Sequence, residues 1–484
     1  MTWTSLNAWV AMPEIFLLFA TCVVLLLDLF VSDAKRHITY VLTLLVLGVT
    51  ALLVVNGMHP VPHLAFNGLF ISDPIAQLAK LGMILGVALV LIYGRDYAIV
   101  RGLFRGELFT LTLFALAGMM IMASSVNFLT LYMGLELLSL SLYALVALQR
   151  DSIASTEAAM KYFILGALAS GMLLYGMSMI YGATASLDVF VIAHKITSGE
   201  ANLMLGAFGL VFLVTGIAFK LGAVPFHMWV PDVYEGAPTL ITQLIGSAPK
   251  LAAFAFVIRL LAQGMEGYAF DWRSMLVVLS VLSMAIGNLT AIAQTSMKRM
   301  MAYSTISHMG FLLLGILVAS PIGYSASFFY AMVYVITAAA GFGMVMLLSR
   351  TGFEADKIDD FKGLAARSPW FACMMMFVMF SMAGIPVFVG FFAKLSVLQA
   401  VVNLGYVWLA VIAVMFSLVG AFYYLRIVKI MYFDEATDTA PIEAGFDTKL
   451  VLSVNCLLLL VLGLMPDRLM AVLSQAVSSS LVVM

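Results

Sequence analysis

Long apolar runs separated by short polar breaks extend along the whole chain. Each run is close to the roughly 20 apolar residues that a helix needs to cross a lipid bilayer. No linker between the runs is long enough to hold a separate soluble domain. The pattern predicts 14 membrane-spanning helices, near 8–30, 38–55, 74–94, 107–125, 128–148, 158–182, 203–224, 239–262, 273–294, 300–319, 323–349, 370–402, 406–433 and 449–465.

The composition fits this pattern. Of 484 residues, 64% are hydrophobic and 10% are charged, with a mean hydropathy of +1.10. Soluble globular proteins contain about 45–50% apolar and about 25% charged residues. We therefore expect an all-α polytopic membrane protein. The formal net charge is −1, and no basic stretch indicates nucleic-acid binding.

The cysteines give no sign of a metal or redox centre. Cys22, Cys373 and Cys456 stand alone in apolar runs, without the spacing of zinc or iron–sulfur ligands. A cleavable signal peptide is also not expected, because the first basic residue, Lys35, follows the first apolar segment.

The basic residues indicate how the chain is oriented. When the 24 Lys and Arg residues are sorted over alternate loops, 15 fall on one side, four on the other and five within helices. Short cytoplasmic loops carry the positive excess, so both termini are predicted to be periplasmic. The four on the minor side are Lys195, Arg259, Arg273 and Arg468.

The chain also contains an internal repeat. Two five-helix blocks, at 107–262 and 273–433, each have a proline, Pro225 or Pro386, in the fourth helix. Because five is odd, the blocks enter the membrane from opposite faces, as in the inverted repeats with broken helices of secondary transporters. We expect a three-helix segment (1–106), a first repeat (107–262), a second inverted repeat (263–433) and a C-terminal helix (434–484).

Few ionisable residues lie deep in the predicted spans. A charge at the membrane centre costs from about 2.5 to more than 10 kcal/mol, so each such residue is a functional candidate. Glu136, Lys220, Lys250 and Lys394 are in this position, and Lys220 lies five residues before Pro225. A lysine that faces a glutamate can be switched between protonated and neutral, as a proton relay requires. A structural or snorkelling side chain is the alternative at each position.

Other residues have weaker claims. Lys161 is close to a helix end and could reach the headgroups, and Lys80 is better explained by snorkelling. His227 and His308 titrate near neutrality and suit a proton wire, although each could equally be a hydrogen-bonded core histidine. Glu14 lies near the end of the first helix.

Three motifs carry a resemblance to a known family. They are FKLGAVPFHMWVPDVYEGAP at 219–238, KRMMAYSTISHMG at 298–310 and SMAGIP at 381–386. With them the chain resembles the antiporter-like membrane subunits of respiratory complex I. The wording DVYEGAP is similar to the N type of the bacterial proton-translocating NADH:quinone oxidoreductase. The resemblance extends over essentially the whole chain.

This resemblance implies a 14-helix subunit with a relay along its centre. In the family, a Glu of the fifth helix pairs with a Lys of the seventh, and a Lys of the eighth passes protons to a charged residue of the twelfth. Glu136, Lys220, Lys250 and Lys394 occupy those places. The Lys of the twelfth helix fits the L and N types and argues against the M type. Family counterparts with weaker claims correspond to Lys161, Lys298 and His308.

The resemblance also implies the function and the partners. We expect a proton-pumping subunit without a redox centre, driven by electron transfer from NADH to quinone. NADH, FMN, iron–sulfur clusters and quinone are expected in partner subunits, with M-type and K-type neighbours in the bacterial inner membrane. The alternatives are a subunit of a multisubunit cation/proton antiporter and a structural scaffold with vestigial charges.

Overall fold

The protein is a bundle of long apolar helices. The structure is a computed structural model that describes residues 6–436, 438 and 440–481. Among these residues, 13 helices are long and apolar enough to cross a membrane. Two shorter apolar helices, Pro369–Ala383 and Val389–Asn403, together occupy the place of a fourteenth span. The all-α polytopic fold expected from the sequence is therefore confirmed.

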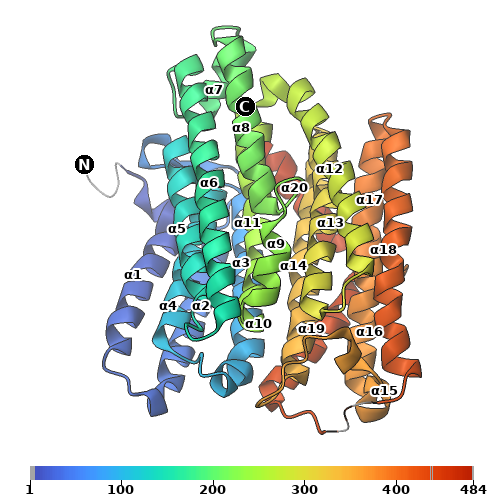
Figure 1. The fold of residues 1–484 in the computed structure, drawn as a ribbon. Helices are drawn as coiled ribbons and strands as arrows, with labels where there is room; N and C mark the ends of the chain where they lie inside the picture. Colours follow the sequence, from blue (N-terminus) through green and yellow to red (C-terminus); the bar gives the residue numbers. More distant parts are fainter. Residues whose placement is uncertain (1–5, 437, 439, 482–484) are drawn as a thin grey trace.

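The N-terminal segment forms one side of the bundle, blue in Figure 1. A two-stranded antiparallel hairpin, which the hydropathy pattern does not predict, lies between its second and third helices. Its elements are α1 (Met12–Asp28), α2 (His37–Asn56), β1 (His63–Ala65), β2 (Phe70–Ser72) and α3 (Pro74–Val100).

The first five-helix block follows. The sequence predicts five helices there, and the structure adds two short ones, α7 and α9, and divides the predicted helix 239–262 at Ser247. The elements are α4 (Gly106–Ser124), α5 (Phe128–Val146), α6 (Ile153–Thr184), α7 (Val189–Thr197), α8 (Leu203–Leu221), α9 (Trp229–Gly236), α10 (Thr239–Gly246) and α11 (Ala248–Val257), which continues as a π-helix over Ile258–Gly264.

The second block lies on the other side of the molecule, yellow to orange-red in Figure 1. The span expected at 370–402 is broken near Pro386, as the sequence predicts, into the two helices α16 and α17. The elements of the block are α12 (Ala269–Ile292), α13 (Met297–Leu317), α14 (Pro321–Leu348), α15 (Leu364–Arg367), α16 (Pro369–Ala383), α17 (Val389–Asn403) and α18 (Val407–Phe433). The C-terminal segment that follows contains α19 (Phe446–Leu464) and α20 (Pro466–Leu481).

The broken helix of each block ends in the same way. Gly222 after α8 and Gly384 after α16 have left-handed backbones, with φ of 78° and 83°. The amide of the next residue then reaches back to the last turn, from Ala223 to Ala218 and from Ile385 to Phe380. This closure is the Schellman motif, for which glycine is the usual residue. Both breaks therefore follow from local sequence rather than from packing alone.

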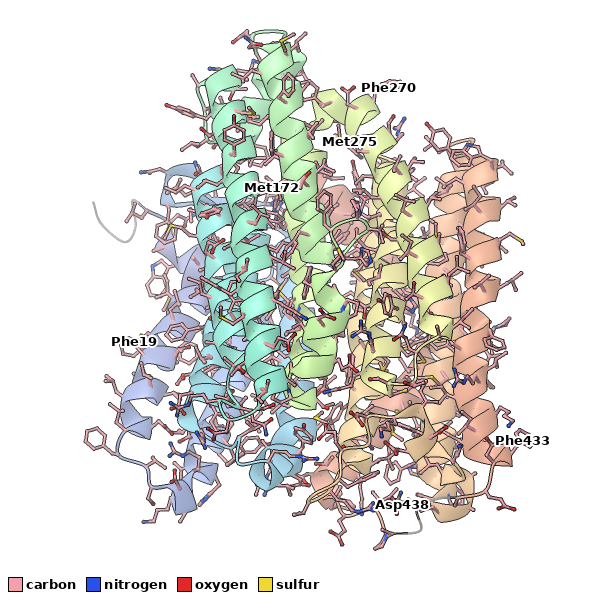
Figure 2. All side chains as sticks on the ribbon, in the orientation of Figure 1. Phe19, Met172, Phe270, Met275, Phe433 and Asp438 are labelled. Atoms are coloured by element: carbon pink, nitrogen blue, oxygen red, sulfur yellow. The ribbon has the colours of Figure 1, made fainter. Side chains whose placement is uncertain are left out.

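Burial divides the helices into an inner and an outer set. The span Thr239–Gly264, which comprises α10, α11 and the π-helix, and the helices α13 and α14 are almost entirely buried. In α1, α2 and α18, by contrast, most side chains are at least partly exposed. Figure 2 shows Phe19 and Phe433 projecting outward on opposite sides of the bundle. Exposed apolar side chains on the outer helices are those expected of a lipid-facing surface. The inner spans carry the buried Lys250, Arg259, Lys298 and His308.

Arg259 has a buried partner that the sequence does not reveal. The loop count places Arg259 outside the spans, but its side chain is fully buried in the π-helix that continues α11. Its guanidinium makes two hydrogen bonds of 2.8 and 2.6 Å with the carboxylate of Asp73, which also caps α3 by accepting from the amide of Ala76. No sequence signal identifies this partner, which is 186 residues away.

Candidate functional site

The first polar cluster joins α5 and α8. Lys220 Nζ donates a hydrogen bond of 2.7 Å to Ser139 Oγ. Glu136 lies three residues before Ser139, on the same face of α5. The expected direct ion pair between Glu136 and Lys220 is absent from the described residues, where Glu136 Oε1 is buried without a hydrogen-bond partner. The lysine therefore lies one helical turn from the acid, held by a serine that the sequence analysis did not single out.

Lys250 lies at the end of the first broken helix. It is 1% exposed, and its Nζ donates a hydrogen bond of 3.0 Å to the carbonyl oxygen of Leu221, the last residue of α8. The ammonium also lies 5.3 Å from the centre of the Trp229 ring. The indole of Trp229 in turn donates to the carbonyl of Phe219, at 3.0 Å. Lys250 thus contacts the end of α8 at Leu221, the residue that directly follows Lys220.

Lys394 occupies the corresponding place in the second block. Its Nζ donates hydrogen bonds of 2.9 Å to the carbonyl of Ala383, the last residue of α16, and to Ser417 Oγ on α18. The same atom lies 5.3 Å from the centre of the Phe311 ring on α13. Ser417 is another contact that no pattern in the sequence indicates.

A third lysine has the same kind of contact. Lys298 is buried, and its Nζ donates a hydrogen bond of 2.9 Å to the carbonyl of Ala237, which directly follows α9. The last carbonyls of a helix have no partner within the helix, and within a membrane water does not supply one. A cation there also interacts favourably with the helix dipole. All three lysines therefore satisfy backbone groups that the interruptions leave free.

His308 is part of a buried hydroxyl network on α13. Its Nδ1 lies 2.5 Å from the hydroxyl of Tyr330 and its Nε2 lies 3.1 Å from that of Tyr424. Tyr424 also contacts Ser304 Oγ. The histidine is thus fully hydrogen bonded, which satisfies its polar atoms and also connects three helices.

A small cavity separates His308 from the second broken helix. Its volume is about 20 Å³, and its walls include His308, Ser381 and Ala393, the residue before Lys394. About 10–15 Å³ is enough for one water molecule. Ser381 Oγ is buried and has no hydrogen-bond partner among the described residues. The cavity can therefore hold a water that joins the histidine network to the region of Lys394.

Two candidates lie apart from this central row. Lys161 has a side chain that is 43% exposed and pairs with Glu157 and Asp232, at 2.8 and 2.9 Å. The sequence left open whether it reaches the headgroups, and this exposed ion-pair cluster is compatible with that alternative. His227 is half-buried in the segment between α8 and α9, where its Nδ1 has no partner among the described residues.

The two blocks are joined at the first break. The amide of Val224 donates a hydrogen bond of 2.9 Å to Ser283 Oγ on α12, the first helix of the second block.

Through the described part of the chain, the searched His, Cys, Asp and Glu residues form no group of three that could hold a metal ion. The amines, hydroxyls and imidazole of this region are groups that can donate and accept protons.

The chain is similar to known membrane proteins. The family model described as "NADH:quinone oxidoreductase/Mrp antiporter, TM" matches residues 124–420. The chain is 62% identical, over 97% of both chains, to NADH-quinone oxidoreductase subunit N of Thiobacillus denitrificans.

Two solved structures have the same fold. A chain of respiratory complex I from Thermus thermophilus with bound aureothin is 29% identical, with a TM-score of 0.82 over 95% of this chain and 98% of that chain. A chain of the Mrp complex from Dietzia sp. is 22% identical, with a TM-score of 0.85 over 99% of this chain and 97% of that chain. The second likeness concerns the fold alone.

Proposed function

The chain belongs to the NADH:quinone oxidoreductase/Mrp antiporter family of membrane proteins, and from this premise we propose that it is the proton-translocating N subunit of a bacterial NADH:quinone oxidoreductase. The 62% identity to a subunit N over 97% of both chains supports this assignment. The protein is accordingly a multi-pass membrane subunit of a respiratory translocase. Oxidation of NADH and reduction of quinone, with FMN and iron–sulfur clusters, belong to partner subunits.

We further propose that protons move along Glu136, Lys220, Lys250 and Lys394, with His308 between the last two. The observation that carries this proposal is the placement of Lys250 and Lys394 on the last carbonyls of the two broken helices. Burial disfavours the ammonium form, whereas a helix C-terminus favours it. These opposing effects allow each amine to take up and release a proton when a neighbouring charge changes.

The orientation and the division of the chain are part of the same proposal. The loops that carry most Lys and Arg residues face the cytoplasm, and both termini are periplasmic. Residues 1–106 form an N-terminal segment, 107–262 and 263–433 are the two inverted repeats, and 434–484 are a C-terminal segment. The matching glycine closures at Gly222 and Gly384 support the two repeats.

A subunit of a cation/proton antiporter is the second function that the family contains. The fold shared with the Mrp complex is compatible with it, but an identity of 22% concerns the fold alone. The identity of 62% to a subunit N favours the oxidoreductase.

The test measures NADH-driven proton uptake by proteoliposomes that contain the assembled complex. Lys220→Gln removes the amine but keeps a donor for Ser139, so assembly should persist while proton uptake per NADH falls. The matched control is Lys195→Gln on α7, where the native Nζ donates to the carbonyl of Thr184 outside the relay. Unchanged uptake and NADH oxidation in Lys220→Gln would exclude Lys220 from the pathway.

A further inference from the structure

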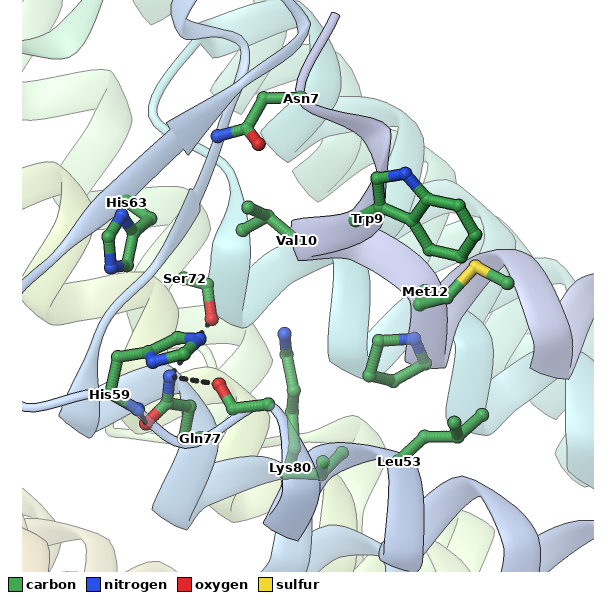
Figure 3. Close-up of a pocket in the computed structure, with 13 residues that line it drawn as sticks. Asn7, Trp9, Val10, Met12, Leu53, His59, His63, Ser72, Gln77 and Lys80 are labelled. Carbon is green, nitrogen blue, oxygen red and sulfur yellow. Dashed lines mark hydrogen bonds between the residues drawn. The ribbon is translucent and has the colours of Figure 1, made fainter. Parts of the chain in front are cut away.

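A cavity of about 310 Å³ lies outside both five-helix blocks, in the N-terminal segment. It opens at the end of the bundle where α1 begins, α2 ends and α3 begins. Figure 3 shows Lys80 rising from α3 into this space, with His59 and His63 on one side and Trp9 and Met12 on the other. One wall is thus polar and the other apolar.

The polar floor contains a buried ion pair. Lys80 Nζ lies 2.6 Å from Glu14 Oε1, and the two side chains are 2% and 5% exposed. Burying such a pair is expensive unless further hydrogen bonds satisfy its remaining donors and acceptors. The proposed relay does not use it. Snorkelling is the explanation of Lys80 that the sequence favours, and the structure adds a partner, because its Nζ pairs with Glu14 in the floor of the cavity.

Lys80 retains unused hydrogen-bonding capacity. A lysine has three N–H donors, and Glu14 accounts for one. The ring of Phe70, with its centre 5.0 Å from Nζ, covers another side of the ammonium. No other acceptor contacts Nζ among the described residues. Because Nζ lines the cavity, an occupant that brings acceptor oxygens would satisfy it.

The rim supplies two more donors on a backbone held by hydrogen bonds. His59 and His63 are exposed, and their ring centres lie 4.9 Å apart. The backbone of His59 is held by Gln77 Oε1, at 3.3 Å, and that of His63 lies in β1 opposite Ser72. Each neutral imidazole offers one N–H, and each offers two when protonated. Backbone contacts therefore hold both histidines at the mouth of the cavity.

The apolar wall continues onto the lipid-facing surface. Trp9 is 66% exposed, and Leu52 on α2 and Phe19 on α1 are also exposed. Tryptophan is enriched at membrane–water interfaces, where its ring has one apolar and one polar side. A ligand in the cavity would therefore meet donors at one end and a hydrocarbon environment at the other.

We propose that this cavity binds the phosphate of a phospholipid headgroup. Lys80, His59 and His63 donate to the phosphate oxygens, and the acyl chains lie along α1 and α2. Glu14 holds the lysine in place. The amphipathic lining and its continuity with the exposed apolar surface favour a lipid over a soluble anion. This binding site goes beyond the proposed function and does not depend on the relay.

The first experiment follows modification of the two histidines by diethylpyrocarbonate, read by peptide mass spectrometry. The purified complex is stripped of lipid and then mixed with phosphatidylglycerol vesicles, vesicles of a neutral glycolipid with the same acyl chains, or inorganic phosphate. We expect phosphatidylglycerol alone to slow modification of His59 and His63, by at least about fivefold. Strong charge-assisted hydrogen bonds to the phosphate would shield the ring nitrogens from the reagent. The exposed His194 on α7 is the internal control.

Each other outcome overturns the proposal. Equal protection by inorganic phosphate would indicate a soluble-anion site, and equal protection by the glycolipid would indicate burial by acyl chains without phosphate recognition. No protection by any additive would indicate a cavity filled by water.

Variants test the role of Lys80. The double exchange Glu14→Gln and Lys80→Gln keeps a polar pair of similar size but removes the ammonium, so protection should fall while NADH-driven proton uptake persists. Lys195→Gln should leave protection unchanged. A second variant, His63→Ala on the exposed rim, should weaken the protection of His59 without affecting folding. Full protection in both the double exchange and His63→Ala would overturn the site.

Discussion

Lys250 donates a hydrogen bond of 3.0 Å from its Nζ to the carbonyl oxygen of Leu221, the residue that ends α8. In the second block, Lys394 makes the same contact with Ala383 at the end of α16. The two lysines come from different positions, one from α11 and the other from the second half of the broken helix itself. A common need for a donor at a helix end within the membrane explains why both places contain a lysine.

Replacing Lys250 separates its backbone contact from its proton chemistry. Lys250→Gln keeps an N–H donor for the carbonyl of Leu221, whereas Lys250→Met removes it. We predict that Lys250→Gln assembles normally but lowers NADH-driven proton uptake at least about tenfold, since a positioned proton-transfer group contributes roughly 10²–10⁴-fold. Lys250→Met should show the same loss and also a lower thermal stability of the complex.

The comparison of these two variants is itself the control. If Lys250→Gln pumped normally while Lys250→Met was unstable, the lysine would serve only as a helix cap. Proton uptake and the midpoint of thermal unfolding, measured on the same preparation, distinguish the two results.

Gly384 provides a test of the second helix end. A Cβ at this position would force a side chain into a left-handed backbone and would lie 2.9 Å from Lys394 Cδ. Left-handed strain alone costs about 1–2 kcal/mol. Gly102→Ala is the matched control, because Gly102 also has a positive φ but has open space around its Cβ position. We predict that both variants lose stability, measured by thermal unfolding, and that only Gly384→Ala also lowers proton uptake.

The spans could be predicted from the sequence because hydropathy reports directly on the bilayer. The places of the broken helices were also predictable, since Pro225 and Pro386 interrupt apolar runs. Hydropathy cannot, however, indicate that Gly222 and Gly384 end the half-helices, or where those helices resume. It also missed α7, α9, α20 and the hairpin, because these elements are too short or too polar to stand out as spans.

The candidate site was predictable in its residue types and not in its contacts. A buried lysine is conspicuous in any apolar run, so Lys220, Lys250 and Lys394 were identified. Their partners Ser139, Ser417 and two backbone carbonyls are ordinary groups that only the three-dimensional arrangement distinguishes.

The buried pair of Arg259 and Asp73 should be important for stability rather than for transport. Removing one partner of a buried ion pair costs about 3–5 kcal/mol, because the other charge is left without compensation. We predict that Arg259→Leu strongly lowers the amount of assembled complex. The double variant Asp73→Asn and Arg259→Leu should restore most of it, since Asn can still cap α3. Native gels of membranes measure the assembled fraction, and no recovery in the double variant would contradict this explanation.

Asp438 should give the segment after α18 a dependence on pH. Its carboxylate accepts from Arg350 and Arg367, at 2.6 and 2.9 Å, and the hydrogen bond from Arg350 holds the pKa of Asp438 below its ordinary value. A lowered carboxyl pKa stabilises the folded form at neutral pH, and this stabilisation is lost as the pH falls below about 4. We therefore predict that Asp438→Asn speeds hydrogen exchange of residues 440–445 at pH 7 by no more than about fivefold, as for an exposed pair.

The same measurement at pH 3.5 provides the check for Asp438. This pH lies near the ordinary carboxyl pKa and above the lowered pKa of the native Asp438, so part of the stabilisation is lost and the ratio of the two exchange rates should be smaller than at pH 7. A ratio between the two that stays constant from pH 7 to pH 3.5 would show that the carboxylate charge does not hold this segment.

The hydroxyl of Tyr424 is predicted to be needed for proton transfer through His308. A neutral imidazole donates through one nitrogen and accepts through the other, so one tyrosine donates to it and the other accepts from it. Tyr424→Phe leaves the Nε2 of His308 buried without a partner, which costs roughly 1–3 kcal/mol. A cost of this size added to the barrier of proton transfer lowers the rate about tenfold, since 1.36 kcal/mol corresponds to a factor of ten. Proton uptake by proteoliposomes should fall by about that factor. Tyr423→Phe is the matched control, because the hydroxyl of Tyr423 donates to Asn288 and not to His308. Equal losses in both variants would assign the effect to packing of α18, and no loss in Tyr424→Phe would remove His308 from the pathway.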